Sequence, residues 1–158
     1  MSLGTEIKKV KPFDALEQEA MLNIARTADV LHGQMEEVLK AGGVSATQYN
    51  VLRILRGAGE SMSCGEIAGR MIAKDPDMTR LLDRLEKRGL VSRCREQKDR
   101  RVVSSRITDA GLKVLSDLDP IVIEAHRRQL GHMGQEKLKQ LIALLEEARQ
   151  TKNVKETP

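Results

Sequence analysis

Apolar residues recur every three or four positions through much of the chain, and this spacing predicts a mainly helical protein. A long helix is expected over residues 14–40, and the two glycines that follow end it. Ser45 and Gln48 have the spacing of a capping box, in which side chains satisfy free backbone donors, so a second helix is expected from there to about Arg56. The first third of the chain is therefore predicted to contain two helices joined by a tight turn.

Two shorter helices are expected in the middle of the chain. Ser63 and Glu66 repeat the capping-box spacing and open the first of them. The second is expected over residues 75–88, with Asp75 as its cap and Pro76 in its first turn, where a missing N–H removes no hydrogen bond. The two helices lie close in sequence, as in a helix-turn-helix.

Two strands and two more helices complete the pattern. Residues 91–95 and 102–107 alternate in the manner of strands on either side of a polar hairpin tip. Thr108 can cap a helix over residues 109–130, and a last helix is expected over residues 135–150. A helix-turn-helix followed by a hairpin is the layout of a winged helix, so the predicted class is mainly α, with a small two-stranded β wing.

The predicted elements divide the chain into a winged helix-turn-helix and flanking helices. Residues 45–108 form the former, residues 14–44 and 109–150 a helical dimerisation region, and residues 1–13 and 151–158 flexible termini. The flanking helices have long apolar stripes, and one small module cannot cover so much apolar surface. We therefore expect a homodimer.

Composition narrows the function classes. The longest apolar runs fall short of the roughly 20 residues of a membrane span, and the N-terminus does not resemble a secretory signal, so a cytoplasmic protein without a membrane partner is expected. His126 and His132 are six residues apart, which does not suit a metal pair on one helix face. No nucleophile-and-base set is recognisable, so we expect neither an enzyme nor a metal or other cofactor.

Positive charge is concentrated in the middle of the chain. The net charge of the whole chain is +4, whereas residues 61–106 contain twelve Lys or Arg against seven Asp or Glu. The rest of the chain, with 15 basic and 16 acidic residues, is close to neutral. A local basic excess favours a polyanionic partner for the winged helix.

The helix expected at residues 75–88 has two distinct faces. Its apolar residues share one face, which should be core, and its charged residues share another: Asp77, Arg80, Arg84 and Lys87. In a helix-turn-helix the exposed face of the second helix enters the DNA major groove. Double-stranded DNA is therefore the expected partner.

Thr79 and Arg80 occupy the first part of this helix, which usually reaches base edges. An arginine can donate two hydrogen bonds to guanine, and a threonine can donate one or offer its methyl group to thymine. Asp77 can accept from cytosine or orient Arg80. The alternative is ion pairing within the helix: Arg80 with Asp77 or Asp83, and Arg84 with Asp83 or a glutamate.

Two residues before this helix are further DNA-binding candidates. Ser63 leaves the positive end of its helix available for a phosphate, although it can equally serve as a cap alone. Lys74 lies in the turn between the two helices, where it can contact the DNA backbone.

At this point the chain resembles the MarR family of bacterial transcription regulators. Four segments follow that family's pattern in order and spacing: TQYNVLRIL (47–55), EIAGRM (66–71), MTRLLDRLEKRGLVSR (78–93) and DRRVVSSRITDAG (99–111). The resemblance implies a homodimer whose terminal helices interlock, a pseudo-palindromic operator and, most often, repression.

The resemblance also implies roles at the hairpin tip. The family's wing motif of Asp, one spacer and Arg falls on Asp99 and Arg101, so Arg101 is expected in the minor groove and Asp99 is expected to brace it. Arg100 fills the spacer and is expected to contact a phosphate, and Lys98 is a further DNA-binding candidate at the tip. The departure from the family pattern is Asp75-Pro76-Asp77, where small polar residues are common.

Many members of this family release DNA when a small aromatic or phenolic acid binds between the dimerisation helices and the winged helix. His32, Tyr49 and Arg53 come from the two helices that would line such a pocket. The competing interpretation is structural, with Tyr49 as a core residue and His32 without a ligand.

Two other functions remain open. Cys64 or Cys94 would act in a redox-sensing repressor, although Cys64 also suits a small buried position. A winged helix used only as a protein-interaction scaffold would have a neutral wing and recognition face, and both are rich in arginine here.

Overall fold

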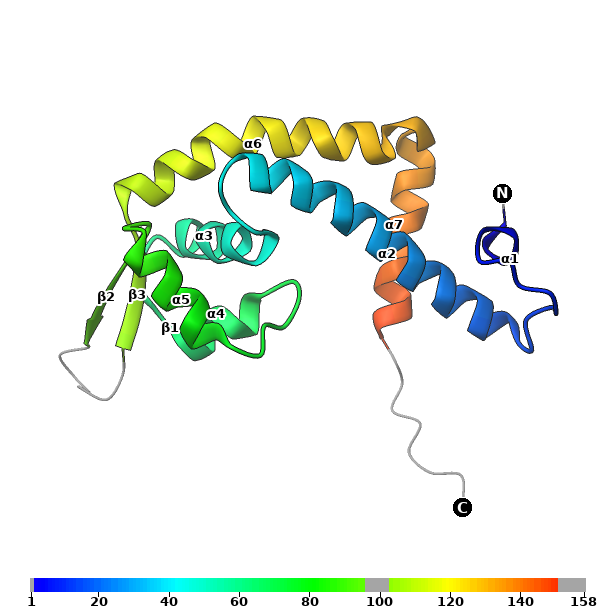
Figure 1. Ribbon diagram of the computed structural model, residues 1–158, viewed down its shortest axis with the longest axis horizontal. Coiled ribbons are helices and arrows are strands. Elements are labelled where there is room, and N and C mark those ends of the chain that lie inside the picture. Colours follow the sequence, from blue (N-terminus) through cyan, green and yellow to red (C-terminus); the bar gives the residue numbers. More distant parts are fainter. Residues whose placement is uncertain (1, 96–102, 151–158) are drawn as a thin grey trace, which may run out of the picture.

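The computed structural model describes residues 2–95 and 103–150, and its architecture confirms the mainly helical class. In chain order the elements are α1 (Leu3–Glu6), α2 (Leu16–Ala41), α3 (Ala46–Ala58), β1 (Met62–Ser63), α4 (Cys64–Arg70), α5 (Met78–Lys87), β2 (Val91–Arg95), β3 (Val103–Ile107), α6 (Asp109–Leu130), the 3-10 turn η1 (Gly131–Met133) and α7 (Gln135–Arg149). The elements from α3 to β3 gather at one end of the molecule, and α2 and α6 extend away from them (Figure 1).

Local caps set most helix starts where the sequence predicts them. Both capping boxes form: the Ser45 hydroxyl accepts from the Gln48 N–H, and the Ser63 hydroxyl accepts from the Glu66 N–H. Thr108 caps α6 by accepting from the Gly111 N–H at 3.2 Å. These caps satisfy backbone donors that a helix leaves free at its first turn.

The start of α5 differs from the prediction. Its cap is Asp77 and not Asp75, because an Asp77 carboxylate oxygen accepts from the Arg80 N–H at 3.2 Å. Asp75 instead accepts from the Asp77 N–H at 2.8 Å, which stabilises a turn that contains Pro76. Thr79 and Arg80 are consequently the second and third residues of the helix, closer to its positive end.

The wing belongs to a three-stranded antiparallel sheet and not to the two-stranded one expected. The strand order is β1-β3-β2, with Met62 opposite Ser105 and Val91 opposite Ile107. The added strand, β1, has only two residues, too few to show the alternation that reveals a strand in sequence. It attaches the start of α4 to the sheet.

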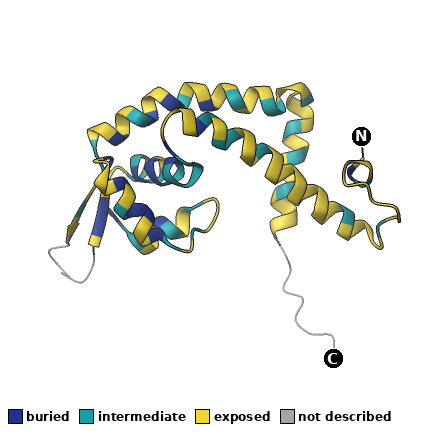
Figure 2. Cartoon of the chain, in the orientation of Figure 1, coloured by how far each residue is buried: buried dark blue, intermediate teal, exposed yellow. Residues whose placement is uncertain are grey.

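One hydrophobic core lies inside the winged helix and is closed by α6. Figure 2 shows buried positions concentrated there, whereas most of α2 and all of α7 are not buried. The core residues are Leu39, Val44, Tyr49, Val51, Leu52, Leu55, Met62, Ile67, Met78, Leu81, Leu82, Leu85, Leu90, Val91, Leu115, Leu118 and Val122. The long helices therefore leave apolar side chains at the surface.

Close backbone contact fixes the start of α6 against the end of α5. The Thr108 hydroxyl donates to the Gly89 carbonyl at 2.6 Å, and the Thr108 N–H donates to the Leu90 carbonyl at 3.1 Å. Gly111 is buried directly over this carbonyl, where a Cβ atom would overlap the Leu90 oxygen. Glycine is therefore needed at this position for packing.

The N-terminal segment, expected to be flexible, includes a short helix. Leu3 in α1 is buried, and Glu6 forms an ion pair with Arg26 of α2 at 3.7 Å. Among the helices of residues 2–95 and 103–150, none combines the length and the apolar character that a membrane crossing requires.

Candidate nucleic-acid interface

The two faces predicted for α5 are present. Its apolar side chains are buried, and the opposite face exposes Thr79, Arg80, Arg84 and Lys87 to solvent. Because the buried face is anchored in the core, the exposed face is held in a fixed orientation. This face has the chemistry for phosphates and base edges: long cations and a hydroxyl.

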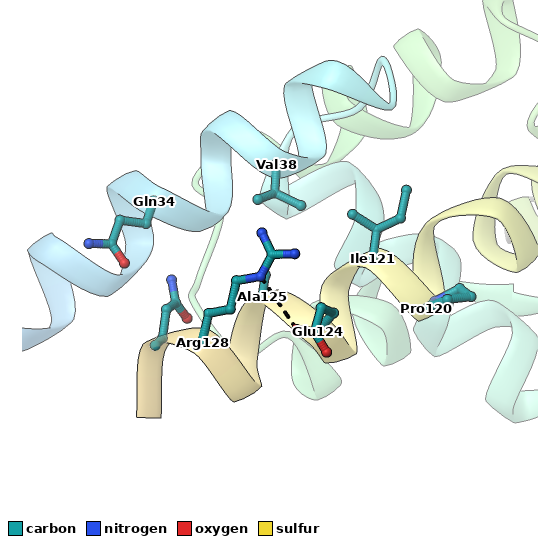
Figure 3. Close-up of a pocket in the computed structure, with 8 residues that line it drawn as sticks. Gln34, Val38, Pro120, Ile121, Glu124, Ala125 and Arg128 are labelled. Atoms are coloured by element: carbon teal, nitrogen blue, oxygen red, sulfur yellow. Dashed lines mark hydrogen bonds and ion pairs between the residues drawn. The ribbon is translucent and has the colours of Figure 1, made fainter. Parts of the chain in front are cut away.

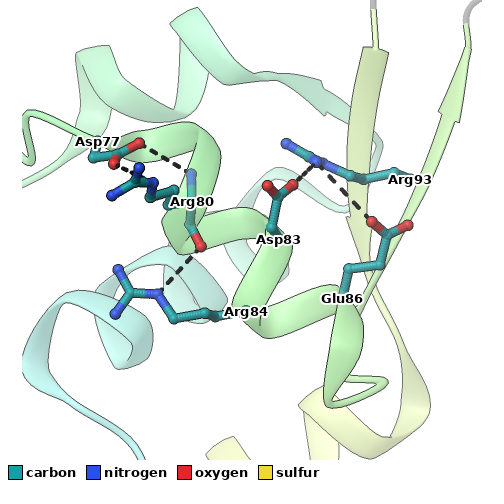
Figure 4. A network of polar contacts seen from close by, with 6 residues as sticks. All are labelled: Asp77, Arg80, Asp83, Arg84, Glu86 and Arg93. Atoms are coloured by element: carbon teal, nitrogen blue, oxygen red, sulfur yellow. Dashed lines mark hydrogen bonds and ion pairs between the residues drawn. The ribbon is translucent and has the colours of Figure 1, made fainter.

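Arg80 forms the first of the predicted ion pairs. Its Nε lies 3.1 Å from a carboxylate oxygen of Asp77, yet its side chain remains 80% exposed (Figure 4). An exposed pair contributes about 1 kcal/mol or less, so a guanine or phosphate can compete for this guanidinium. Asp77 thus caps the helix and orients Arg80 at the same time.

Arg84 does not form either of its predicted ion pairs. Its Nε donates to the Arg80 carbonyl at 3.2 Å, which points the guanidinium along the exposed face. Within the described residues no carboxylate lies within ion-pair distance of it. Its remaining donors are available to a ligand.

Asp83 pairs with Arg93, a residue for which no role was predicted from the sequence. Arg93 of β2 forms an ion pair with Asp83 and lies 4.0 Å from the Glu86 carboxylate (Figure 4). The Arg93 side chain is only 18% exposed, and its buried Nε has no hydrogen-bond partner among the residues that the structure describes. This bridge joins α5 to β2 of the wing. Asp83 and Glu86 lie three residues apart on α5, and a strand with basic residues follows in sequence. This pattern was the sequence signal from which the bridge could have been predicted.

The remaining helix-turn-helix candidates differ in exposure. The Ser63 hydroxyl and N–H both donate to the Glu66 carboxylate at 2.7 Å, and these hydrogen bonds lower the pKa of Glu66. An ionised carboxylate therefore already occupies the positive end of α4, which favours the capping role of Ser63 over phosphate binding. Lys74 is exposed in the turn between α4 and α5.

The wing-tip candidates, Lys98, Asp99, Arg100 and Arg101, lie outside the described residues. The strands β2 and β3 on either side of them in sequence are described, and they pair from Val91 with Ile107 to Arg95 with Val103.

Two of the three effector candidates are in contact. Tyr49 is buried, its hydroxyl donates to Asp119 of α6 at 2.7 Å, and the Arg53 guanidinium lies 5.9 Å from the centre of its ring. Burial and the bond to Asp119 raise the pKa of Tyr49 to about 12. His32 is exposed on α2.

A groove between α2 and α6 contains none of these three residues. Its floor is mainly apolar, and Arg128 and Glu124 pair at one side, with Nε and oxygen 3.4 Å apart (Figure 3). The lining residues are Gln34, Val38, Pro120, Ile121, Glu124, Ala125, Arg128 and Gln129.

The two cysteines differ in how far they are buried. Cys64 is partly buried against the core, whereas Cys94 is exposed on β2 with its sulfur 3.4 Å from the Ser104 hydroxyl. Across the described residues, no three His, Cys, Asp or Glu side chains gather as metal ligands.

Known proteins are similar to this chain in both sequence and fold. The model of the MarR family matches residues 44–103, which include the whole helix-turn-helix. The transcriptional repressor MdtR of Bacillus subtilis is 34% identical over 102 residues, 65% of each chain. The transcriptional repressor IacR of Pseudomonas putida is 31% identical over 120 residues, 73% of this chain and 71% of that protein.

A solved structure extends the likeness to the flanking helices. The MarR transcription factor from Planctomyces limnophilus is 48% identical, with a TM-score of 0.67, over 85% of this chain and 98% of that one. The match therefore includes the long helices as well as the winged helix. The chain belongs to the MarR family of transcription regulators.

Proposed function

We propose that this MarR-family regulator binds a pseudo-palindromic operator as a homodimer and responds to a small aromatic acid. The observation that carries DNA binding is the exposed face of α5, where Arg84 has no acidic partner among the described residues and Arg80 has only an exposed one. A winged helix used only as a protein-interaction scaffold is expected to have a neutral face here, and this face is rich in arginine.

Base reading is assigned to the first turns of α5. Thr79 and Arg80 stand at its N-terminal end, the part of a recognition helix that meets base edges, and Arg84 follows one turn later. Lys87 and Lys74 extend the positive surface toward the phosphates. Asp77 remains close to Arg80, so we infer that it limits the bases that Arg80 accepts.

The surface of the long helices supports a dimer. None of the residues of α7 is buried, and Ile142 and Leu144 are 55% and 64% exposed. On α2, Leu16 and Met21 are 80% and 66% exposed. Apolar side chains gathered on terminal helices favour burial against a second copy of the chain. Two recognition helices would then read half-sites roughly 34 Å apart.

The groove between α2 and α6 is the better candidate for an effector than the residues chosen from sequence. The Tyr49 hydroxyl is buried in its bond to Asp119, whereas the groove combines apolar walls with the Arg128 guanidinium, whose pair with Glu124 is exposed and therefore open to competition by an acid. A benzoate-like acid needs such a pairing of an apolar surface and a cation.

Titration of benzoate and salicylate against the operator complex should release DNA, and release should be lost in Arg128→Ala. If no aromatic acid changes operator affinity, this part of the proposal fails.

The experiment that tests DNA binding is a gel shift with the DNA upstream of the protein's own coding region, at several stated salt concentrations. A saturable shift that survives an excess of unrelated DNA and weakens as salt rises is expected. Equal affinity for upstream and unrelated DNA, or no shift at low salt, would refute operator recognition.

A further inference from the structure

We propose that Tyr49, Arg56 and Asp119 form an orientation clamp that fixes the winged helix against α6 and thereby sets which half-site spacing the dimer accepts. The inference rests on the proposed operator binding by a dimer. The clamp itself touches no DNA, so these are positioning residues.

The clamp uses both oxygens of one carboxylate. The Tyr49 hydroxyl donates to one Asp119 oxygen at 2.7 Å, and an Arg56 terminal nitrogen donates to the other at 2.5 Å. Tyr49 and Arg56 are seven residues apart on α3, two helical turns, so they lie on the same face. Two donors on one element thus hold a single acceptor on another, which restrains rotation as well as distance.

The clamp joins the two functional parts of the chain. Among the described residues, Arg56–Asp119 is the ion pair that connects an element of the winged helix to one of the long helices; the others lie within one of these parts or, for Glu6–Arg26, join α1 to α2. Helices α3 and α6 also contribute apolar side chains, such as Leu52 and Leu115, to the same hydrophobic core. Apolar contact is non-directional, whereas hydrogen bonds have strict geometry.

At neutral pH the protonation states of Tyr49 and Asp119 favour the hydrogen bonds of the clamp. Burial tends to raise the pKa of Asp119, but the hydrogen bonds from Arg56 and Tyr49 outweigh it, and the pKa lies below its ordinary value. The pKa of Tyr49 is raised. The carboxylate is therefore ionised and the phenol keeps its proton. The Arg53 guanidinium lies over the Tyr49 ring, 5.9 Å from its centre.

The clamp also lies where α6 can bend. Pro120 follows Asp119 directly inside the helix, and its nitrogen cannot donate to the carbonyl four residues earlier. Helices bend most readily at such a site. Leu115 and Leu118 before Pro120 and Val122 just after it lie in the core, whereas the groove against α2 is lined by residues of α6 from Pro120 onwards. A polar restraint at this joint would fix how each winged helix is presented by the dimer.

The test compares operators that differ only in the spacing between half-sites. Wild type, Tyr49→Phe and Asp119→Asn are titrated against the operator and against versions lengthened or shortened by one and two base pairs. The matched control is Asp117→Asn, which breaks an exposed ion pair with Lys113 (2.8 Å) on the same helix. Thermal unfolding and gel filtration of every variant confirm a folded dimer.

Wild type and Asp117→Asn are expected to discriminate strongly between spacings. Tyr49→Phe and Asp119→Asn should lose about tenfold of this discrimination, the value of one charge-assisted hydrogen bond, while their affinity for unrelated DNA stays unchanged. Tyr49→Phe removes only a hydroxyl, so it decides the question if Asp119→Asn does not fold. A spacing profile as narrow as that of wild type in a folded variant would overturn the clamp. Failure of wild type to bind any spacing would instead overturn the proposed function.

Discussion

Tyr49 illustrates how much a single buried polar group can reveal. It is the chain's one tyrosine, and sequence alone left it between a core role and an effector role. Tyr49 is 7% exposed and its hydroxyl bonds to Asp119, which favours the core role. Asp119 is 70 residues away in sequence, so no local sequence pattern indicates this hydrogen bond. Arg93 escaped prediction for a related reason, since its bridge to Asp83 depends on how β2 packs against α5.

The raised pKa of Tyr49 predicts a pH dependence of stability. Its ordinary value is 10.0 and its value in the fold is about 12, so the stabilisation is complete below pH 10 and is lost as pH rises toward 12. Tyr49→Phe has no ionisable phenol. The difference in free energy of unfolding between wild type and this variant should therefore be constant from pH 7 to 9 and shift against wild type by about 1.4 kcal/mol near pH ~11. Urea unfolding at each pH measures it; a difference that stays constant through about pH 11 would contradict the assignment.

At the scale of elements, prediction succeeded where the signal was local. Ser45, Ser63 and Thr108 cap the helices that the sequence assigned to them, because a cap involves residues only three apart. It failed at the start of α5, where Asp75 and Asp77 both offer a capping carboxylate and only the geometry of the preceding turn selects between them. It also missed β1, whose two residues pair with a strand about forty residues later.

The junction between the wing and α6 provides a prediction at this scale. Gly111→Ala places a Cβ atom against the Leu90 carbonyl and should cost about 1–3 kcal/mol of stability, because neither backbone can move without disturbing the Thr108 cap. Gly57→Ala in α3 meets open space and should be neutral or stabilise by up to about 1 kcal/mol. Urea unfolding of both variants gives the comparison. Equal effects at the two positions would show that Gly111 is not required for packing.

At the scale of the whole molecule, the division between the buried winged helix and the exposed long helices dominates. The winged helix has a closed core, whereas α7 and much of α2 present apolar side chains to solvent. An isolated chain would leave this surface uncovered, and a second copy offers the same surface in return. This division supports the proposal that the long helices serve assembly and α5 serves recognition.

The assembly role predicts the effect of charges on α7. Ile142→Glu combined with Leu144→Glu introduces carboxylates at two exposed apolar positions on different sides of the helix, which the proposed dimer would bury. The dissociation constant of the dimer should rise at least tenfold, because each buried apolar side chain contributes about 1.5–3 kcal/mol. Ile72→Glu, an 87% exposed position on the winged helix, is the control. Sedimentation that shows wild type itself to be a monomer at micromolar concentration would refute the dimer.

The central claim is that α5 reads the operator, and the affinity of Arg80→Ala and Arg84→Ala for that operator tests it most directly. Each substitution should weaken binding by about 1–3 kcal/mol, roughly tenfold to a hundredfold, with the dimer intact. Arg127→Ala, which breaks a similarly exposed i,i+3 ion pair with Glu124 on α6, should bind as wild type does. If both α5 variants keep wild-type affinity and sequence preference, α5 does not read the operator.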